Sequence, residues 1–360
     1  MKWLPTFLIL LLILVLITLP IFFVRYIVPN MPMSVPYAFY KTHILGGFSI
    51  DTPEKATKAA DYGVQVVFKY GSPPSEKDQL GKKLESLHMK VIDGMLWEYL
   101  FDYECHRIKT VKPPPVGYGP FSAGYVPYCT TDDHPEMTSE SVLLQYISAH
   151  LQQVKNNRLI VGYWVLDDWV PWDAGSAKQI LIDIHKLIQR YTPDRPTICG
   201  LGGTISLNQG YGWDDWIADN FSPEGCDRVG LYIYTSSILN TTPLPSPARF
   251  NWSMVGVLPE MFASLQQRGW NITKEPLIGI GQAFGGPLVN SKRYYATPNA
   301  KDIETQSRSF CEHGATGLTF YAWDDSGFGP KTQTPMNNPQ IATGIRNGIA
   351  ACKQYWSNHP

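Results

Sequence analysis

The feature that most constrains this chain is a regular alternation of short strand-like runs with amphipathic helical stretches, repeated eight times after residue 42. Strands that alternate with helices pair in parallel, and eight such units predict closure into a single (β/α)8 TIM barrel of the α/β class. The predicted strands lie at residues 43–50, 65–70, 90–96, within 161–172, and at 197–201, 228–235, 277–283 and 317–324.

The segments between these runs carry the helical pattern. The predicted helices lie at residues 53–62, 75–87, 139–156, 177–191, 214–220, 254–268, 300–313 and 339–355. Residues 98–137 are predicted to be a long loop, and loops of this length often serve as lids or binding walls. No linker or change of composition divides the region, so residues 42–360 are predicted to form one domain.

The N-terminus has a different character. Residues 4–24 are almost all Leu, Ile, Val and Phe, and about 20 apolar residues span a bilayer, whereas a signal-peptide core has roughly 7–15. No small-x-small cleavage site follows. We therefore expect a transmembrane signal anchor at residues 1–25 and a proline-containing stalk at 26–41. The barrel is expected to be anchored to a membrane and to lie outside the cytoplasm.

The six cysteines show no metal-ligand spacing. In an oxidising compartment some are expected to pair, with Cys105 bonded to Cys129 across the long loop and Cys311 to Cys352 between neighbouring helices. Buried free thiols are the alternative.

Composition narrows the class of partner. A formal net charge of -1 argues against nucleic acid. Aromatic residues make up 13% of the chain and charged residues only 17%, which fits a surface that stacks on sugar rings. A large aromatic core would give the same composition. No Gly-rich loop of the nucleotide-binding type opens a helix, and no cofactor is predicted.

The barrel prediction places function at the carboxyl ends of the strands. Polar, acidic and aromatic residues gather at the ends of the predicted strands. They are Ser49, Asp51, Lys69, Tyr70, Trp97, Glu98, Asp167, Asp168, Thr204, Tyr232, Tyr234, Gln282, Trp323, Asp324 and Asp325.

The stretch VGYWVLDDWVPW, residues 161–172, ends in two aspartates between tryptophans. Strand alternation puts Asp167 on the face of the valines and Asp168 on the face of Trp164, which predicts that Asp168 points into the barrel. A carboxylate flanked by indole rings suits acid–base chemistry on a sugar, and Trp169 is expected to contact that sugar. The alternative is that one aspartate caps the next helix and the tryptophans only pack.

The same alternation applies to the later strands. In the sixth strand it turns Tyr232 and Tyr234 inward, and in the eighth it turns Tyr321, Trp323 and Asp325 inward. A β-bulge within a strand would reverse which of the following side chains point inward.

Three blocks carry a resemblance to a known family. They are VGYWVLDDWVPW with the following YTPDRPT turn, PLIGIGQAFGG, and TQSRSFCEHGATGLTFYAWDDSG. They resemble the fourth, seventh and eighth units of bacterial TIM-barrel proteins related to glycoside hydrolase clan A. The resemblance covers most of the second half of the chain.

The resemblance implies roles for particular residues. It places Asp168 at the position of the general acid and Asp167 beside it, Tyr234 near the tyrosine that supports the nucleophile, and Trp323 at the floor of the sugar site. Gln282 stands where the clan has its nucleophilic glutamate. A neutral amide cannot form a glycosyl-enzyme intermediate, so a retaining mechanism is in doubt.

Three interpretations remain open. In an inverting hydrolase Asp168 is the acid and Asp325, Asp324 or Glu98 is the base. In a non-catalytic barrel the site binds carbohydrate without cleaving it. In the third, Asp324 and Asp325 hold a divalent cation, although they lack the spacing of a ligand loop. In the first two, the residues expected to contact the carbohydrate are Trp97, Asp167, Trp169, Tyr232, Tyr234, Gln282 and Trp323.

Overall fold

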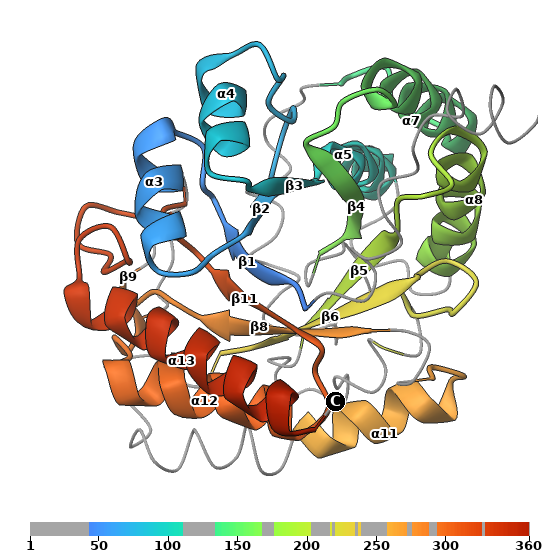
Figure 1. Ribbon diagram of the computed structural model, residues 1–360. Coiled ribbons are helices and arrows are strands. Elements are labelled where there is room, and N and C mark those ends of the chain that lie inside the picture. The colour runs from blue at the N-terminus through green and yellow to red at the C-terminus, as the bar shows by residue number, and fades with distance from the viewer. Residues whose placement is uncertain are drawn as a thin grey trace, which may run out of the picture. The chain divides into compact units, whose positions relative to one another are not determined.

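The computed structural model describes residues 43–110, 134–167, 176–202, 217, 220–234, 237–238, 258–271, 276–287, 294–325 and 328–359. Its centre is a closed barrel of parallel strands in the order β1-β11-β8-β6-β5-β4-β3-β2 (Figure 1). The barrel strands are Leu45–Phe48 (β1), Val66–Lys69 (β2), Lys90–Asp93 (β3), Ile160–Leu166 (β4), Thr197–Gly202 (β5), Arg228–Ile233 (β6), Leu277–Gln282 (β8) and Gly317–Tyr321 (β11). All eight predicted strands are present, and the (β/α)8 prediction is confirmed.

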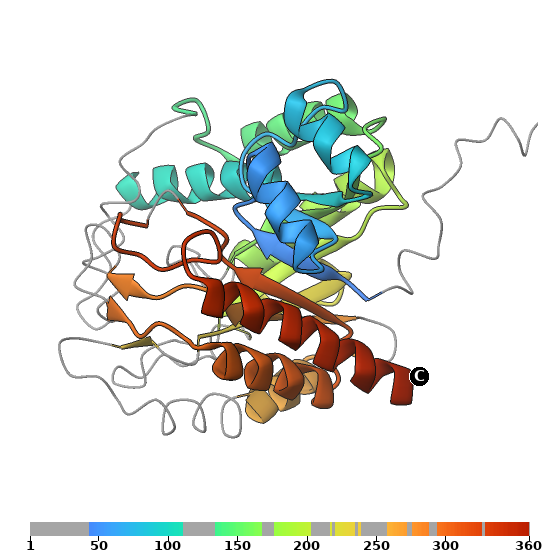
Figure 2. The same cartoon turned by 60° about the vertical axis from the view of Figure 1, so that its left-hand side comes forward.

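Helices surround these strands on the outside (Figures 1 and 2). Their bounds are Pro53–Asp61 (α3), Gln79–Ser86 (α4), Met95–Thr110 (α5), Glu140–Val154 (α7), Ser176–Tyr191 (α8), Leu258–Gln267 (α11), Ala300–Glu312 (α12) and Pro339–Asn358 (α13). The helix predicted at 214–220 falls almost wholly outside the described residues.

Capping residues explain where several helices begin. The Thr52 side chain accepts a hydrogen bond from the Lys55 backbone N–H, and Pro53 opens the first turn of α3. Asn299 and Asp302 form a reciprocal capping box at the start of α12. Such side chains satisfy backbone donors that have no partner within the helix, so local sequence is sufficient to start these helices.

The prediction of a loop from residue 98 was wrong for its first part, because α5 begins directly after β3. Asp93 Oδ1 accepts a hydrogen bond from the Met95 backbone N–H at 3.0 Å, while Asp93 Oδ2 lies 2.7 Å from His150 Nε2 on α7. This buried pair holds the end of β3 against the neighbouring helix. The buried stripe of α5 includes Leu96 and Leu100, whose i,i+4 spacing lies within a segment rich in aromatic and charged residues.

Aromatic rings fill the barrel interior. Trp164 lies edge-on to Phe48 and Phe68, with ring centroids 5.5 Å apart in each pair. Glycines on β5 and β6 leave room for the indole, since a Cβ on Gly200 would collide with it and a Cβ on Gly230 would stand 3.0 Å from its Cη2 atom. The interior is therefore a packed core and not a channel.

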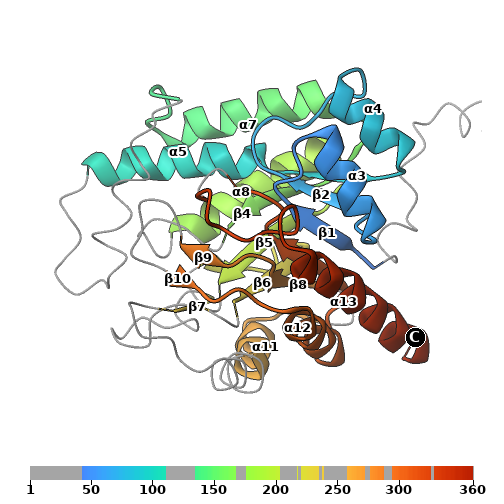
Figure 3. The ribbon, with the colours of Figure 1, turned by 90° about the vertical axis from the view of Figure 1, so that its left-hand side faces the viewer.

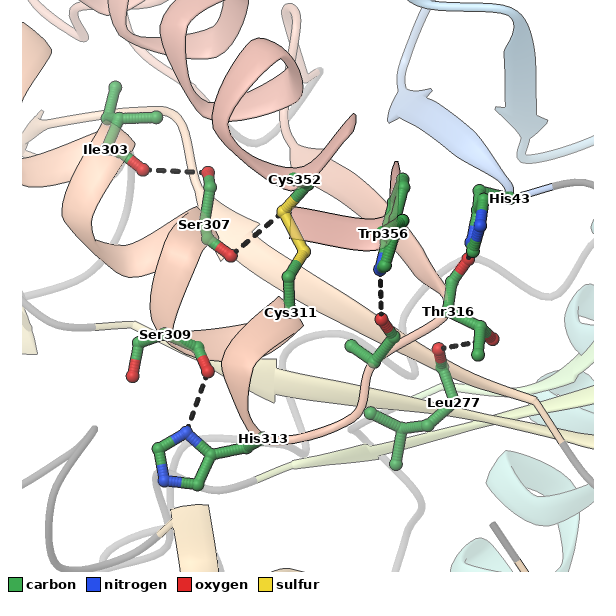
Figure 4. The surroundings of a disulfide bond; sticks show 11 residues. His43, Leu277, Ile303, Ser307, Ser309, Cys311, His313, Thr316, Cys352 and Trp356 are labelled. Atoms are coloured by element: carbon green, nitrogen blue, oxygen red, sulfur yellow. Dashed lines mark hydrogen bonds between the residues drawn. A yellow bond between two sulfur atoms is a disulfide. The ribbon is translucent and has the colours of Figure 1, made fainter. Parts of the chain in front are cut away.

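The last two helices lie side by side (Figure 3). Gly344 and Gly348 of α13 let the two backbones approach, and the Cys311–Cys352 disulfide joins the helices (Figure 4). The prediction of this disulfide is confirmed. A further disulfide, Cys199–Cys226, was not predicted.

Cys105 is also disulfide-bonded, whereas Cys129, its predicted partner, lies outside the described residues.

The residues just before β1 and β11 are tied to the C-terminal part of α13 and to each other. The His43 and Trp356 rings stack with centroids 3.8 Å apart, the Trp356 indole N–H donates to the Ala315 carbonyl, and His43 Nδ1 bonds to the Thr316 carbonyl (Figure 4). These contacts fix α13 against the start of β1.

A small antiparallel sheet extends beyond the barrel strands, in the order β7-β10-β9. Its strands are Ser237–Ile238 (β7), Gly286–Pro287 (β9) and Tyr294–Tyr295 (β10), and they lie at the end of the barrel where β6 and β8 finish (Figure 3). The sheet therefore builds one wall of the barrel mouth.

The predicted anchor and stalk, residues 1–41, lie outside the described residues. Within the described part of the chain, no helix has the length and apolar character needed to cross a bilayer.

Candidate functional site

The carboxyl ends of the eight barrel strands form the mouth, which is where TIM-barrel chemistry is found. Two carboxylates at the mouth each accept a hydrogen bond from a tyrosine. Asp167, just after β4, is bound by Tyr70, and Asp325, just after β11, is bound by Tyr321. Tyr232 of β6 contacts the tyrosines of both pairs, Tyr70 through its hydroxyl and Tyr321 through its ring.

Asp167 is held by a chain of hydroxyl groups. The Tyr70 hydroxyl donates to Asp167 Oδ2 at 2.5 Å, and the Tyr232 hydroxyl lies 3.4 Å from the Tyr70 hydroxyl. Burial, and next the charge of Asp167, raise the pKa of Tyr70 well above its ordinary value. Tyr70 therefore remains a protonated donor, and Asp167, only 7% exposed, is the acceptor.

The inward direction of Asp167 corrects the alternation argument, which put it on the outer face. The pairing of β4 with β5 runs Trp164 to Ile198 and then Leu166 to Cys199, so the register shifts between the two pairs. Two residues of β4 thus advance against one of β5, which is the geometry of a β-bulge and reverses the phase of the residues that follow.

Asp325 is held in a similar way. The Tyr321 hydroxyl donates to Asp325 Oδ2 at 2.5 Å. The Tyr321 ring packs against Tyr232 and Tyr234, with centroids 6.1 Å away in each case. Tyr321 thus joins the strand end that carries Asp325 to the aromatic interior.

An aromatic wall continues from Tyr234 toward the small sheet. Phe284 lies edge-on to Tyr234 at 5.3 Å and is stacked with Phe328 at 5.0 Å. Tyr295 packs on Phe284 at 4.8 Å. Tyr321 and Phe328 are partly exposed, whereas Tyr232, Tyr234, Phe284 and Tyr295 are buried. The predicted inward direction of Tyr232 and Tyr234 agrees with these contacts.

Asp324 points to a different partner from Asp325. Lys55 Nζ of α3 lies 2.8 Å from Asp51 Oδ1 and 2.9 Å from Asp324 Oδ2. Burial lowers the pKa of Lys55, but its two aspartate partners outweigh that effect and the pKa is raised. Asp324 is therefore ion-paired with a lysine that it shares with Asp51. This pairing weakens both the candidacy of Asp324 as a base and the hypothesis of a cation between Asp324 and Asp325.

The third-strand candidates lie on α5 and not on a loop. Trp97 is buried and packs on Phe101, with ring centroids 5.7 Å apart. Glu98 is partly exposed, and its carboxylate oxygens stand within 3.7 Å of the position a Gly71 Cβ would take, close to Lys69 Nζ. Of the two, Glu98 is the residue open to the mouth.

Gln282 lies beneath the rim and is 0% exposed. Its side-chain amide donates to the Phe284 carbonyl at 2.8 Å and to the Ala296 carbonyl at 3.4 Å. These bonds hold the segment between β8 and the small sheet. The amide that the sequence resemblance placed at the nucleophile position thus holds two backbone carbonyls.

Trp323 was expected to face inward and does not. It is 0% exposed, and its ring stands 3.3 Å from the position a Gly47 Cβ would take. A Cβ on Gly46 would instead face Thr319 and Phe68, and the Phe68 ring lies among the interior aromatic residues. Adjacent residues of a strand point to opposite faces, so Gly47, and with it Trp323, lies on the outer side of the barrel. β11 ends at Tyr321, and strand alternation does not extend beyond it. Tyr321 is the aromatic residue of this strand that faces the mouth.

Asp168, Trp169 and Thr204 lie outside the described residues. Within the described ranges, no group of three or more His, Cys, Asp or Glu side chains is arranged to hold a metal ion. An open surface depression runs along α7 between Ser141 and Gln152.

Sequence reasoning listed Tyr70 among the strand-end residues and turned Tyr321 inward, but it gave neither tyrosine a role in the site. Tyr70 follows Phe68 by two positions at the end of β2, so strand alternation puts both on the inner face. That signal identifies an inward hydroxyl at the mouth, but its carboxylate partner lies 97 residues further along the chain.

Comparison with known proteins identifies the fold. No family model and no curated protein matches the sequence. The endo-beta-1,4-mannanase from Thermotoga petrophila superposes with a TM-score of 0.54 at 12% identity, over 89% of this chain and 78% of the mannanase. The beta-galactosidase from the psychrophilic Marinomonas ef1 gives 0.52 at 12% identity, over 88% of this chain and 60% of that enzyme. The resemblance to glycoside hydrolase barrels is thus confirmed at the level of the fold.

Proposed function

We propose that this chain is a glycoside hydrolase that cleaves a poly- or oligosaccharide bound at the barrel mouth. The observation that carries the proposal is the pair of tyrosine-bound carboxylates, Asp167 and Asp325, at the ends of β4 and β11. Carboxylates at strand ends of such barrels are the usual catalytic groups, and aromatic side chains offer flat faces to sugar rings. The barrels shared with a mannanase and a galactosidase support the same class.

The proposed mechanism is inverting, because the seventh barrel strand offers the amide of Gln282 and no carboxylate. A protonated acid gives its proton to the glycosidic oxygen as the bond from that oxygen to the anomeric carbon breaks. A carboxylate base removes a proton from water, whose oxygen forms the new bond on the opposite face. We assign the base to Asp325, with Glu98 as the alternative base. The acid is assigned to Asp168 from the sequence resemblance, since this residue lies outside the described ranges.

The first prediction tests the acid. Asp168→Asn should lower kcat/KM on a natural glycan by a factor of order 10², because acid catalysis is lost. On an aryl glycoside, whose leaving group departs without protonation, the loss should be much smaller. The measurement is steady-state kinetics on both substrates, with the anomeric configuration of the first product followed by NMR.

The control is Asp183→Asn, which removes a carboxylate paired with Lys186 on the outer helix α8. Equal losses on both substrates would contradict the acid role of Asp168. A product of retained configuration would contradict inversion.

A binding protein without hydrolytic activity is the second candidate, and the state of Gln282 favours it. The buried amide holds backbone carbonyls and so replaces a nucleophile by a structural group. A wild-type protein that binds a glycan by calorimetry yet releases no reducing sugar over a broad panel would establish this function and exclude the enzyme.

We further propose that residues 4–24 anchor the barrel to a membrane and that the barrel lies outside the cytoplasm. The disulfides Cys199–Cys226 and Cys311–Cys352 support this side, since disulfides persist in oxidising compartments. In cells, the full chain should sediment with membranes and a chain starting at residue 42 should not. A cysteine-alkylating reagent that reacts with Cys311 without prior reduction would argue against the proposed compartment.

A further inference from the structure

The mouth contains two tyrosine–aspartate pairs with the same geometry. Tyr70 to Asp167 and Tyr321 to Asp325 both have oxygen–oxygen distances of 2.5 Å. In each pair the tyrosine hydroxyl donates to a carboxylate oxygen, and a hydrogen bond donated to a carboxylate favours its ionised form. The members of the first pair directly follow β2 and β4, whereas Tyr321 ends β11 and Asp325 lies four residues further on, so the two pairs are built from different strands.

The direction of the hydrogen bonds follows from the number of protons. A phenol has one proton, and the proton of Tyr70 is given to Asp167. The Tyr232 hydroxyl, 3.4 Å from the Tyr70 oxygen, is then the donor in that contact. The protons of the chain Tyr232–Tyr70–Asp167 all point toward the carboxylate, which is the arrangement that stabilises its negative charge.

An acceptor that is stabilised as an anion is a poor proton donor. We propose, building on the glycoside hydrolase function above, that Asp167 and Asp325 are the two anionic groups of the site, positioned by Tyr70 and Tyr321, and that the proton donor is a third residue. This assigns new roles to both tyrosines and changes that of Asp167 from sugar contact to charge stabilisation.

The roles of the two anions differ. Asp325 takes the proton of the attacking water, as in the mechanism above. Asp167 transfers no proton and forms no bond; its charge faces the positive charge that develops on the sugar ring in an oxocarbenium-like transition state. Asp167 is 7% exposed, so this charge acts from the edge of the protein interior, where electrostatic interactions are stronger than in water.

The experiment compares Asp167→Asn, Asp325→Asn, Tyr70→Phe and Tyr321→Phe on a natural glycan and on an aryl glycoside of the same sugar. Both aspartate variants should lose a factor of order 10² or more on both substrates, because neither group protonates the leaving oxygen. Both tyrosine variants should lower kcat with little change in KM. Sodium azide should restore turnover to Asp325→Asn and yield the glycosyl azide of inverted configuration.

The matched control is Tyr191→Phe, which removes a hydroxyl bonded to Ser148 on the outer helices and should leave both rates unchanged. A loss confined to the natural glycan in Asp167→Asn would make Asp167 the acid and overturn the inference, while leaving the hydrolase function intact. A wild type inactive on every glycan would overturn both.

A second readout needs no activity. Ultraviolet titration of tyrosinate should show one tyrosine ionising at lower pH in Asp167→Asn than in the wild type, because the charge beside Tyr70 is gone. The same substitution in a Tyr70→Phe background should produce no such change. Identical titration curves for the wild type and Asp167→Asn would contradict the pair itself.

Discussion

At the scale of single residues, the barrel interior depends on glycines placed opposite aromatic rings. Trp164 occupies space that side chains on Gly200 and Gly230 would otherwise take. Layers of branched aliphatic side chains usually fill this type of barrel. Here one indole from β4 reaches across to Phe48 and Phe68, and it forms the layer below the hydrogen-bonded tyrosines of the mouth.

Gly200→Ala is expected to destabilise the fold by about 1–3 kcal/mol, the usual cost of overpacking a core. The measurement is urea unfolding followed by circular dichroism. In a Trp164→Phe background the same substitution should cost less, because the smaller ring vacates the space that the new methyl group needs. Additive costs in this double-mutant cycle would show that the two residues do not compete for space.

At the scale of elements, the strand ends that form the mouth are held in place by side-chain hydrogen bonds between helices and strands. Arg195 makes several of them. Its guanidinium donates to the carbonyls of Val154, Lys155 and Asn157 at 2.9–3.1 Å and to the Tyr163 hydroxyl at 3.0 Å. These carbonyls lie at the last residue of α7 and just after it, where backbone acceptors lack partners within the helix. Arg195 thereby joins the end of α7 to β4, the strand that carries Asp167.

Arg195→Lys is expected to lower the free energy of unfolding by roughly 1–3 kcal/mol, because one ammonium cannot reach all the acceptors that the planar fork satisfies. Chemical denaturation measures this. Arg190→Lys, at an exposed position in the last turn of α8, is the control and should change stability by less than about 0.5 kcal/mol. Equal effects of the two substitutions would show that the carbonyl contacts contribute nothing specific.

At the scale of the whole molecule, buried phenols make the barrel sensitive to alkali. Burial raises the pKa of Tyr163 and, together with the charge of Asp167, that of Tyr70. Both pKa values are higher in the folded state than in the unfolded chain, where tyrosine titrates near about 10. Their contribution to stability is therefore complete below about pH 10 and is lost as the pH rises through the folded values.

The free energy of unfolding should accordingly be lower at about pH 11 than at pH 8. The Tyr70→Phe variant should show a smaller decrease over this interval, because one buried ionisable group is gone. Urea titrations at both pH values measure the difference. A variant that loses as much stability as the wild type would show that Tyr70 does not contribute to the decrease in the free energy of unfolding at high pH.

The amino-acid sequence by itself determined the architecture. Strand and helix periodicities are local properties of the backbone, and together with caps such as Thr52 and Asn299 they were sufficient to place eight strands and most helices. The Cys311–Cys352 disulfide followed from the expected adjacency of the last two helices. The helix α5 was missed because charged and aromatic residues are interspersed among its apolar positions, and a segment of this composition does not show a clear helical period.

Only the tertiary structure decided which side chains form the mouth. A bulge in β4 depends on its register with β5, and that register turned Asp167 inward where alternation had predicted Asp168. The end of β11 at Tyr321 decided that this tyrosine, and not Trp323, faces the interior. The Gln282 amide donates to the carbonyls of Phe284 and Ala296, on the two sides of the small sheet's β9–β10 segment. The Tyr70 hydroxyl donates to a carboxylate 97 residues away. Alternation describes one strand alone, whereas these contacts depend on how neighbouring strands and loops are aligned in space, which no local pattern encodes.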